Sequence, residues 1–254
     1  TWRTPANDGV LDKLETYSES SFYQVLGLPY DAGNLPITEE EVYACCEDTE
    51  FINPANPPDH FQTQHLFAGI DWAWNTKEGG QAFTIITIAR LHGNRIEIVY
   101  AKRFHGPQYH NPSTVLSEIA NICNKLGVKV IGTDFGIGHK ENLRLKEMVN
   151  AKVLEMLYTG SGTEMTWDNE AKCFKLGRTV ILDLVFNRLK KGLYRFPKRS
   201  VIQPFATDIL NVYAEYDPNW KRLKYEHAGT GPDDFLHCLA YLSLIIEQFY
   251  SIRI

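Results

Sequence analysis

The sequence predicts an α/β protein built on a mixed sheet, in which an antiparallel meander of three strands is continued by parallel strands, with helices on both faces. Three apolar runs follow one another at 66–74, 82–91 and 95–104, and such a succession indicates a meander. From residue 111 onward, helical and strand-like segments alternate, which is typical of parallel strands joined by right-handed crossovers. The 254 residues are 44% hydrophobic, enough for a sizeable core.

The meander and the first crossover have clear boundaries in the sequence. His92, Gly93 and Asn94 form a tight turn between the second and third strands. A helix is predicted from Asn111 to about residue 125, because its apolar residues recur at helical spacing and Gly127 follows as a stop. The segment 128–133 then reads as a short buried strand, so we expect it to lie parallel to the first strand.

The remaining elements follow the same alternation. We predict a helix over 142–149, a strand over 152–158, and a loose turn over 159–163 that leads into a polar excursion. The segment 178–191 is strongly amphipathic and stops at Gly192. A helix over 208–216, a strand over 221–227 and a last helix from about residue 231 to about Tyr250 complete the prediction.

Residues 1–65 differ in texture and are interpreted as an acidic linker or arm that precedes a domain spanning 66–254. Short helical patterns at 11–17 and 38–45 are separated by proline-rich joints. Thr38 and Glu41 have the spacing of a capping box. An ordinary irregular lead-in fits the composition equally well.

Charge is unevenly distributed along the chain, whose net charge is −5. Residues 1–60 hold twelve acidic and two basic side chains, whereas residues 172–199 hold nine basic side chains and one acid, Asp183. A concentrated basic patch of this kind can bind a polyanion even in an acidic chain. The five cysteines show no zinc or disulfide spacing, and no apolar run is long enough to cross a membrane, so we expect a soluble protein from a reducing compartment.

Carboxylates at the ends of three predicted elements are the candidate chemical site. Asp71 lies inside the first apolar strand, Asp134 follows the crossover strand, and Asp233 and Asp234 begin the last helix. Carboxylates that converge without a basic partner repel one another, and Mg²⁺ or Mn²⁺ is the natural remedy. Each residue also has a simpler interpretation: an ion pair for Asp71, a turn for Asp134, and the helix dipole for Asp233 and Asp234.

The order and flanks of these residues resemble the RNase H-like nuclease domain of the large terminase subunit of tailed bacteriophages, the motor protein that packages and cuts viral DNA. The likeness is carried by Gly-Ile-Asp-Trp at 69–72, Ile-Gly-Thr-Asp-Phe-Gly-Ile-Gly at 131–138, the helix at 178–192 with Phe-Pro at 196–197, and Tyr-Glu-His at 225–227 leading to Asp-Asp-Phe-Leu-His-Cys-Leu-Ala-Tyr at 233–241. The lead-in at 21–30 also resembles the segment that joins the family's ATPase to its nuclease. The likeness therefore spans nearly the whole chain.

The resemblance implies an endonuclease that cuts double-stranded viral DNA by two-metal phosphodiester hydrolysis and leaves 5′-phosphate and 3′-hydroxyl ends. It implies that Asp71, Asp134 and Asp234 ligate two Mg²⁺ or Mn²⁺ ions, and that Asp233 supports a ligand or bridges the ions. Between the adjacent pair we favour Asp234.

Basic side chains in the patch are candidates for gripping phosphates without reading bases: Lys172, Lys175, Arg178, Arg195, Lys198 and Arg199. His139, Lys140 and His227 lie near motif residues and are candidates for substrate contact. A solvated basic face and ordinary structural histidines are the simpler interpretations.

The chain contains no phosphate-binding loop of the type G-x-x-x-x-G-K-[ST], so the family's ATPase domain is absent from it. The resemblance implies that this ATPase domain belongs to the same full-length protein, that the portal and the small terminase subunit are partners, and that the protein works in the cytoplasm of an infected bacterial host. The alternatives are another RNase H-like nuclease, such as a Holliday-junction resolvase or a transposase core, and a non-catalytic docking module of a packaging motor. A sugar-kinase or actin type of fold is disfavoured because Trp72 and Ala73 follow Asp71 in place of a glycine and a hydroxyl.

Overall fold

The computed structural model describes residues 35–61, 63–73, 83–160, 165–217, 222–227 and 231–251. Contacts divide the chain into two compact units, Thr1–Pro36 and Ile37–Ile254. The predicted helical pattern at 11–17 and the lead-in at 21–30 lie outside the described residues. Within the described part of the chain, no helix combines the length and the apolar character needed to span a bilayer.

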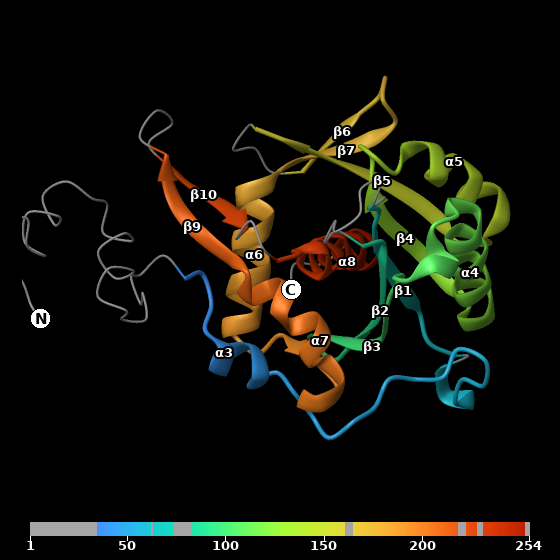
Figure 1. Ribbon diagram of the computed structural model, residues 1–254, viewed down its shortest axis with the longest axis horizontal. Coiled ribbons are helices and arrows are strands. Elements are labelled where there is room, and N and C mark those ends of the chain that lie inside the picture. Colours follow the sequence, from blue (N-terminus) through green and yellow to red (C-terminus); the bar gives the residue numbers. More distant parts are fainter. Residues whose placement is uncertain are drawn as a thin grey trace, which may run out of the picture. The chain divides into compact units, whose positions relative to one another are not determined.

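The larger unit is built on an eight-stranded sheet with the strand order β6-β7-β5-β4-β1-β2-β3-β8 (Figure 1). Its strands are β1 (Leu66–Asp71), β2 (Ile85–His92), β3 (Arg95–Arg103), β4 (Val128–Asp134), β5 (Lys152–Thr159), β6 (Thr166–Asp168), β7 (Cys173–Gly177) and β8 (Tyr194–Arg195). A separate two-stranded sheet pairs β9 (Val212–Asp217) with β10 (Arg222–His227).

The predicted sheet class is confirmed. Strands β1, β2 and β3 form an antiparallel meander, and β4, β5 and β7 continue the sheet from β1 as parallel neighbours. Strand β1 is therefore central, because it pairs with β2 on one side and with β4 on the other. The mixed sheet expected from the sequence is the one observed.

Helices cover both faces of this sheet (Figure 1). Their bounds are α3 (Glu39–Tyr43), α4 (Pro112–Leu126), α5 (His139–Met148), α6 (Arg178–Lys190), α7 (Arg199–Leu210) and α8 (Asp234–Tyr250), with short 3-10 turns at Asp59–Phe61 and Pro107–Tyr109. Helix α8 packs directly on β1, β2 and β4, and α6 and α7 pack against α8. Helices α4 and α5 lie on the opposite face, where α4 buries the apolar stripe that the sequence predicts.

Two glycines allow α8 to approach the sheet so closely. A Cβ atom at Gly69 of β1 would lie 2.4 Å from the carbonyl oxygen of Cys238, and one at Gly132 of β4 would lie 2.9 Å from a methyl group of Ile245. Both partners belong to α8, so β1 and β4 present their glycines to this helix. Since side chains alternate along a strand, the residue two positions beyond each glycine faces the same side.

The predicted helix over 208–216 is wrong. Helix α7 covers Arg199–Leu210, and strand β9 begins at Val212. The strand has the period-two burial of a sheet, since Val212 and Ala214 are buried and Tyr213 is exposed. Pro204 lies inside α7. Because proline usually interrupts a helix, the sequence pattern does not indicate a helix at this position.

Other boundaries also differ from the prediction. Strand β1 ends at Asp71 instead of residue 74, and α5 begins at His139 instead of residue 142. Strands β6, β7 and β8 have no counterpart in the prediction, because they are two to five residues long and carry too little periodicity to be recognised.

The part of the predicted arm that follows Ile37 packs in the same compact unit as the sheet. Thr38 and Glu41 form the expected capping box of α3. Ile37, Val42 and Cys45 are buried in the core beside α6, α7 and α8. Backbone hydrogen bonds at Cys45 and Glu47 join this segment to Phe196. The division of the chain at residue 65 stays a prediction.

Candidate functional site

Asp71 and Asp134 occupy equivalent places at the ends of two neighbouring strands. Each is the last residue of its strand, β1 or β4, and the two strands pair in parallel with Ile70 opposite Thr133. Each also lies two residues beyond a glycine that faces α8. The sequence therefore places both carboxylates at one edge of the sheet and on the face that α8 covers.

Asp234 reaches the same region from the last helix. It is the first residue of α8, and its side chain is buried. The backbone N–H of Phe83, just before β2, donates a hydrogen bond of 3.1 Å to Asp234 Oδ2. Because β2 pairs with β1, this bond ties the start of α8 to the strand that carries Asp71.

The electrostatics of Asp71 show that these carboxylates act on one another. Burial raises the pKa of Asp71 well above its usual value, and the negative charges of Asp234, Asp134, Asp233 and Asp208 raise it further. Burial is also the main reason why the pKa of Asp234 is raised, although its bond from Phe83 works against the shift. A cluster of acids with these properties is a site where a cation would lower the free energy of the ionised form.

Oxygen donors of this kind fit a hard divalent cation such as Mg²⁺ or Mn²⁺. Among the residues that the structure describes, no three His, Cys, Asp or Glu side chains lie at the spacing of a finished metal site. What the structure does bring together are Asp71, Asp134 and Asp234, on two strand ends and one helix start.

Asp233 has partners of its own. Its Oδ2 accepts hydrogen bonds of 3.1 Å from Arg178 Nη2 and from His237 Nε2. The other ring nitrogen of His237, Nδ1, lies 2.9 Å from the hydroxyl oxygen of Tyr158 on β5. The adjacent carboxylates of Asp233 and Asp234 therefore face different partners, a cation and an imidazole for the first and a backbone amide for the second.

Asp208 is a buried acid of this region that the sequence did not reveal. Both of its oxygens accept from Arg103 Nη2, at 2.6 and 2.7 Å, and the N–H of Phe235 donates to its Oδ2 at 2.9 Å. Burial raises the pKa of Asp208 to about 6, against the opposing effect of Arg103. The residue thus satisfies an amide in the first turn of α8. A signal was present, since an aspartate lay in the apolar run of 205–210.

Most of the basic candidates in 172–199 form ion pairs with acidic side chains. Lys172 is exposed at the turn before β7, whereas Lys175 Nζ lies 2.6 Å from an oxygen of Asp168. Arg178 bonds the carbonyl oxygen of Tyr225 as well as Asp233, so it lies at the carboxylate edge.

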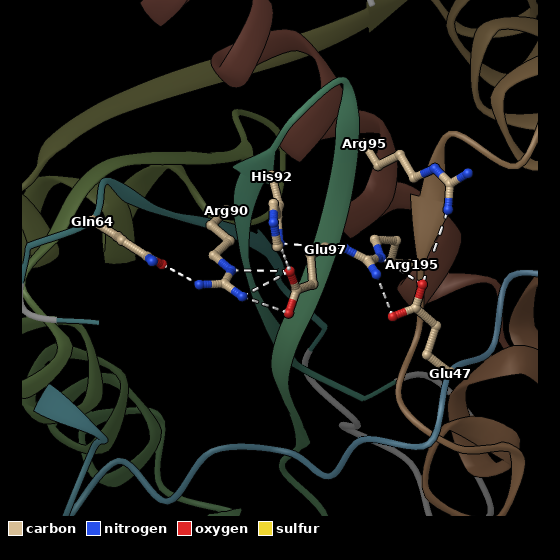
Figure 2. A network of polar contacts seen from close by, with 7 residues as sticks. All are labelled: Glu47, Gln64, Arg90, His92, Arg95, Glu97 and Arg195. Carbon is tan, nitrogen blue, oxygen red and sulfur yellow. Dashed lines mark hydrogen bonds and ion pairs between the residues drawn. The ribbon is translucent and has the colours of Figure 1, made fainter. Parts of the chain in front are cut away.

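Three further candidates pair with acids from the segment that contains α3. Arg195 makes a two-pronged contact with Glu47, with both distances at 2.6 Å (Figure 2). Arg199 pairs with Glu39, and Lys198 pairs with Glu50. Figure 2 also shows that the network continues through His92 and Glu97 to Arg90, on β2 and β3. The acidic segment thus offsets much of the positive charge that the sequence pattern displays.

The remaining candidates lie on two different elements, α5 and β10. His139 Nδ1 is 2.7 Å from Glu155 Oε2, so this ring is engaged in a partly buried contact. Lys140 is exposed in the first turn of α5, close to Asp134 in the chain. His227 is the last residue of β10.

Comparison with known proteins was informative only at the level of structure. No protein-family model and no curated protein matches the sequence. The large terminase nuclease from thermophilic phage G20c superposes with a TM-score of 0.55 at 12% identity, covering 82% of this chain and 96% of that one. A manganese-soaked, inhibitor-bound nuclease domain of human cytomegalovirus terminase gives a TM-score of 0.52 at 11% identity, with 86% and 98% covered.

A longer protein also matches in structure. A large terminase from another thermophilic bacteriophage gives a TM-score of 0.50 at 13% identity, and the match covers 96% of this chain but 52% of that one. The chain therefore corresponds to about half of that protein. At these identities the comparison concerns the fold, and the chain has the RNase H-like fold of terminase nuclease domains.

Proposed function

We propose that the chain is a metal-dependent endonuclease that cuts double-stranded viral DNA during genome packaging. The observation that carries this proposal is the grouping of Asp71, Asp134 and Asp234 at one sheet edge, with the pKa of Asp71 strongly raised by burial and by its acidic neighbours. A carboxyl whose pKa is raised both by burial and by neighbouring acids is a candidate for a site that binds a cation.

In this proposal Asp71, Asp134 and Asp234 hold the metal, and Mg²⁺ or Mn²⁺ is the fitting ion. When bound, such ions supply an activated water and stabilise the charge on the departing 3′ oxygen. The Phe83 amide holds the Asp234 carboxylate in place. Arg178 and His237 hold Asp233, which would support a ligand or bridge two ions. The products would carry 5′-phosphate and 3′-hydroxyl ends.

The proposed substrate and partners are supported by the descriptions of proteins that share the fold. Two of them are described as terminase nucleases, and one is a large terminase about twice as long as the matched part. We infer that this chain is joined to an ATPase domain in its full-length protein and works with a portal and a small terminase subunit inside an infected bacterial cell. Lys172, Lys175, Arg178, Arg195, Lys198 and Arg199 are its candidates for phosphate contact, and His139, Lys140 and His227 are its further candidates for substrate contact.

The test is cleavage of plasmid DNA with Mg²⁺ or Mn²⁺, compared with the same reaction in EDTA. We expect the wild type to cut only with metal, and Asp71→Asn and Asp134→Asn to abolish cutting while thermal unfolding stays cooperative. Asp59→Asn is the control, because it removes an exposed carboxyl that lies in a different element. If Asp71→Asn cuts DNA at the wild-type rate, the assignment of Asp71 to the metal site is wrong.

Two other functions would give different results in this assay. A Holliday-junction resolvase would prefer four-way junctions to linear or plasmid duplex DNA. A docking module without catalysis would leave DNA intact with either metal, and its partner binding would be unchanged by Asp71→Asn. The carboxylate cluster favours an enzyme over the module, because a cation bound there would offset the repulsion among Asp71, Asp134 and Asp234.

A further inference from the structure

Asn142 is a fully buried amide that joins the ends of β1 and β4. It lies on α5, and its Oδ1 accepts from the indole Nε1 of Trp72 at 2.7 Å and from the hydroxyl of Thr133 at 3.1 Å. Its Nδ2 donates to the backbone carbonyl oxygen of Asp134 at 2.7 Å. One side chain therefore contacts the residue next to Asp71 in the chain, the residue before Asp134, and Asp134 itself.

The chemistry of its neighbours fixes the orientation of this amide. The Asp134 carbonyl and the Glu155 carboxylate can only accept, and Asn142 Nδ2 lies 2.7 and 3.2 Å from them. The Trp72 indole can only donate, so it must meet the amide oxygen. In this orientation the amide oxygen accepts from Trp72 and Thr133, and the amide nitrogen donates to Asp134 and Glu155. Rotating the amide by 180° would exchange its donor and acceptor and break these hydrogen bonds.

Glu155 anchors the amide from behind. Its carboxylate also receives a hydrogen bond from Lys146 Nζ and lies 2.7 Å from His139 Nδ1. Burial alone would raise the pKa of Glu155, but hydrogen bonds from Lys146, His139 and Asn142 outweigh it and leave the pKa lowered. The carboxylate is thus held ionised, and it keeps Asn142 from turning away from the strand ends.

The residues that bond Asn142 and the carboxylates of Asp71 and Asp134 lie on opposite faces of the sheet. Trp72 packs with α4 residues in the core beneath the sheet, and Thr133 alternates with Asp134 along β4. Asp71 and Asp134 face α8 instead. Gly138 leaves room for the Trp72 ring, because a Cβ atom at this position would lie 1.8 Å from it. Any slip between β1 and β4 would break these contacts and move one carboxylate relative to the other.

We propose that Asn142 is a positioning residue that sets the separation of Asp71 and Asp134 and thereby the affinity of the site for a divalent cation. The inference rests on the proposed function, since it assigns to these carboxylates the metal-binding task. Side chains that orient metal ligands without touching the ion change metal affinity by about 10–100-fold when they are removed.

The experiment is calorimetric titration of the chain with Mn²⁺ in the absence of DNA, for the wild type and Asn142→Leu. We expect Asn142→Leu to bind Mn²⁺ at least about 10-fold more weakly. The matched control is Asn124→Leu, which also removes an amide that joins two segments. Asn124 on α4 donates to the Met148 carbonyl oxygen at 2.8 Å and accepts from the Asn150 amide, and it precedes β4, whose other end carries Asp134. We expect the control to lose thermal stability but to keep its Mn²⁺ affinity.

A second variant covers the case in which Asn142→Leu does not fold. The double change Trp72→Phe and Thr133→Val removes both donors to Asn142 Oδ1 and keeps an aromatic and a β-branched side chain at the two positions. It should weaken Mn²⁺ binding several-fold, while DNA affinity measured in EDTA stays at the wild-type value.

The outcomes separate the two proposals. If the wild type binds Mn²⁺ and the folded variants bind it equally well, the role of Asn142 is wrong and the nuclease proposal stands. If Asn124→Leu loses as much Mn²⁺ affinity as Asn142→Leu, the loss follows from lower stability in general and the role of Asn142 is again wrong. If the wild type itself binds no Mn²⁺, the proposed function fails and takes the inference with it.

Discussion

At the scale of single residues, the two adjacent aspartates at the start of α8 have different surroundings. Asp234 is buried, bonds the Phe83 amide and raises the pKa of Asp71 more than any other charge does. Asp233 instead contacts Arg178 and His237. We therefore expect Asp234 to bind the cation directly, whereas Asp233 already contacts a guanidinium and an imidazole.

This difference predicts unequal effects of two equivalent changes. Asp233→Asn should reduce metal-dependent cleavage by about 10–100-fold, the range for residues that orient a ligand. Asp234→Asn should reduce it further, to the level without added metal. Cleavage rates at saturating Mg²⁺ measure the difference. A larger loss in Asp233→Asn than in Asp234→Asn would reverse the two roles.

A second prediction concerns Glu155 and acid. Its folded-state pKa is lowered, so its ionised form stabilises the folded chain at pH values above the unfolded-state pKa of about 4.3. This contribution is lost as the pH falls from there through the lowered folded-state value. The difference in the free energy of unfolding between the wild type and Glu155→Gln should therefore become smaller as the pH is lowered from about 5 to 3. Thermal unfolding of both proteins at each pH measures this difference.

Other carboxylates titrate in the same range, so the comparison needs a reference. Glu118→Gln serves here, because Glu118 pairs with Lys102 on β3 at a partly exposed position away from Asn142. The stability difference between Glu118→Gln and the wild type should be smaller than that of Glu155→Gln, as expected for a more exposed ion pair. A gap between Glu155→Gln and the wild type that stays constant with pH would contradict the assignment.

At the scale of elements, the contact between α8 and β1 positions the site. Helix α8 can bring Asp234 to the strand ends only because Gly69 leaves room for the Cys238 carbonyl. Gly69→Ala would place a Cβ atom 2.4 Å from that oxygen, a distance at which the backbone must move. We expect a loss of about 1–3 kcal/mol in the free energy of unfolding.

The matched control is Gly160→Ala, because a Cβ atom at Gly160 meets nothing within 4 Å. Chemical denaturation of both variants gives the two free energies. Metal affinity should also fall in Gly69→Ala, since its strain displaces the start of α8 relative to Asp71. Equal stabilities for the two variants would mean that α8 shifts away from the sheet without cost.

The same elements show what the sequence could predict. The meander, the crossover helix α4 and the last helix were predictable because their apolar residues repeat at a clear period. Acids at strand ends and helix starts are also visible in sequence order. Asn142 and Asp208 were not recognised, because a polar residue inside a helix reveals its partners only after strands distant in the chain are placed beside it.

The ion pairs of the basic patch escaped prediction for a related reason. Composition gives the charge of each segment but not which segments lie together. Residues 1–60 were noted as acidic and 172–199 as basic, and the structure joins parts of the two through Glu39, Glu47 and Glu50. The DNA-binding assignment of the basic residues therefore stays a prediction that has to account for their acidic partners.

At the scale of the whole molecule, this charge pairing decides how strongly the chain can hold DNA. Exposed ion pairs contribute little free energy, typically below about 1 kcal/mol, so a phosphate could replace Glu39 beside Arg199 or Glu50 beside Lys198. Neutralising these two acids would free both cations for DNA. If the DNA path crosses this surface, the double change Glu39→Gln and Glu50→Gln should tighten DNA binding.

The salt dependence of binding distinguishes a local effect from a general one. Each additional phosphate contact steepens the slope of log affinity against log salt by about 0.9, so the double change should steepen it by up to about 2. Glu40→Gln with Glu147→Gln changes the net charge equally, at two exposed sites outside these ion pairs, and should leave the slope unchanged. Filter binding across a salt series in EDTA measures both slopes without cleavage. Equal slopes for the two double variants would place the DNA path away from Lys198 and Arg199, toward Lys172, Arg178 and the carboxylate edge.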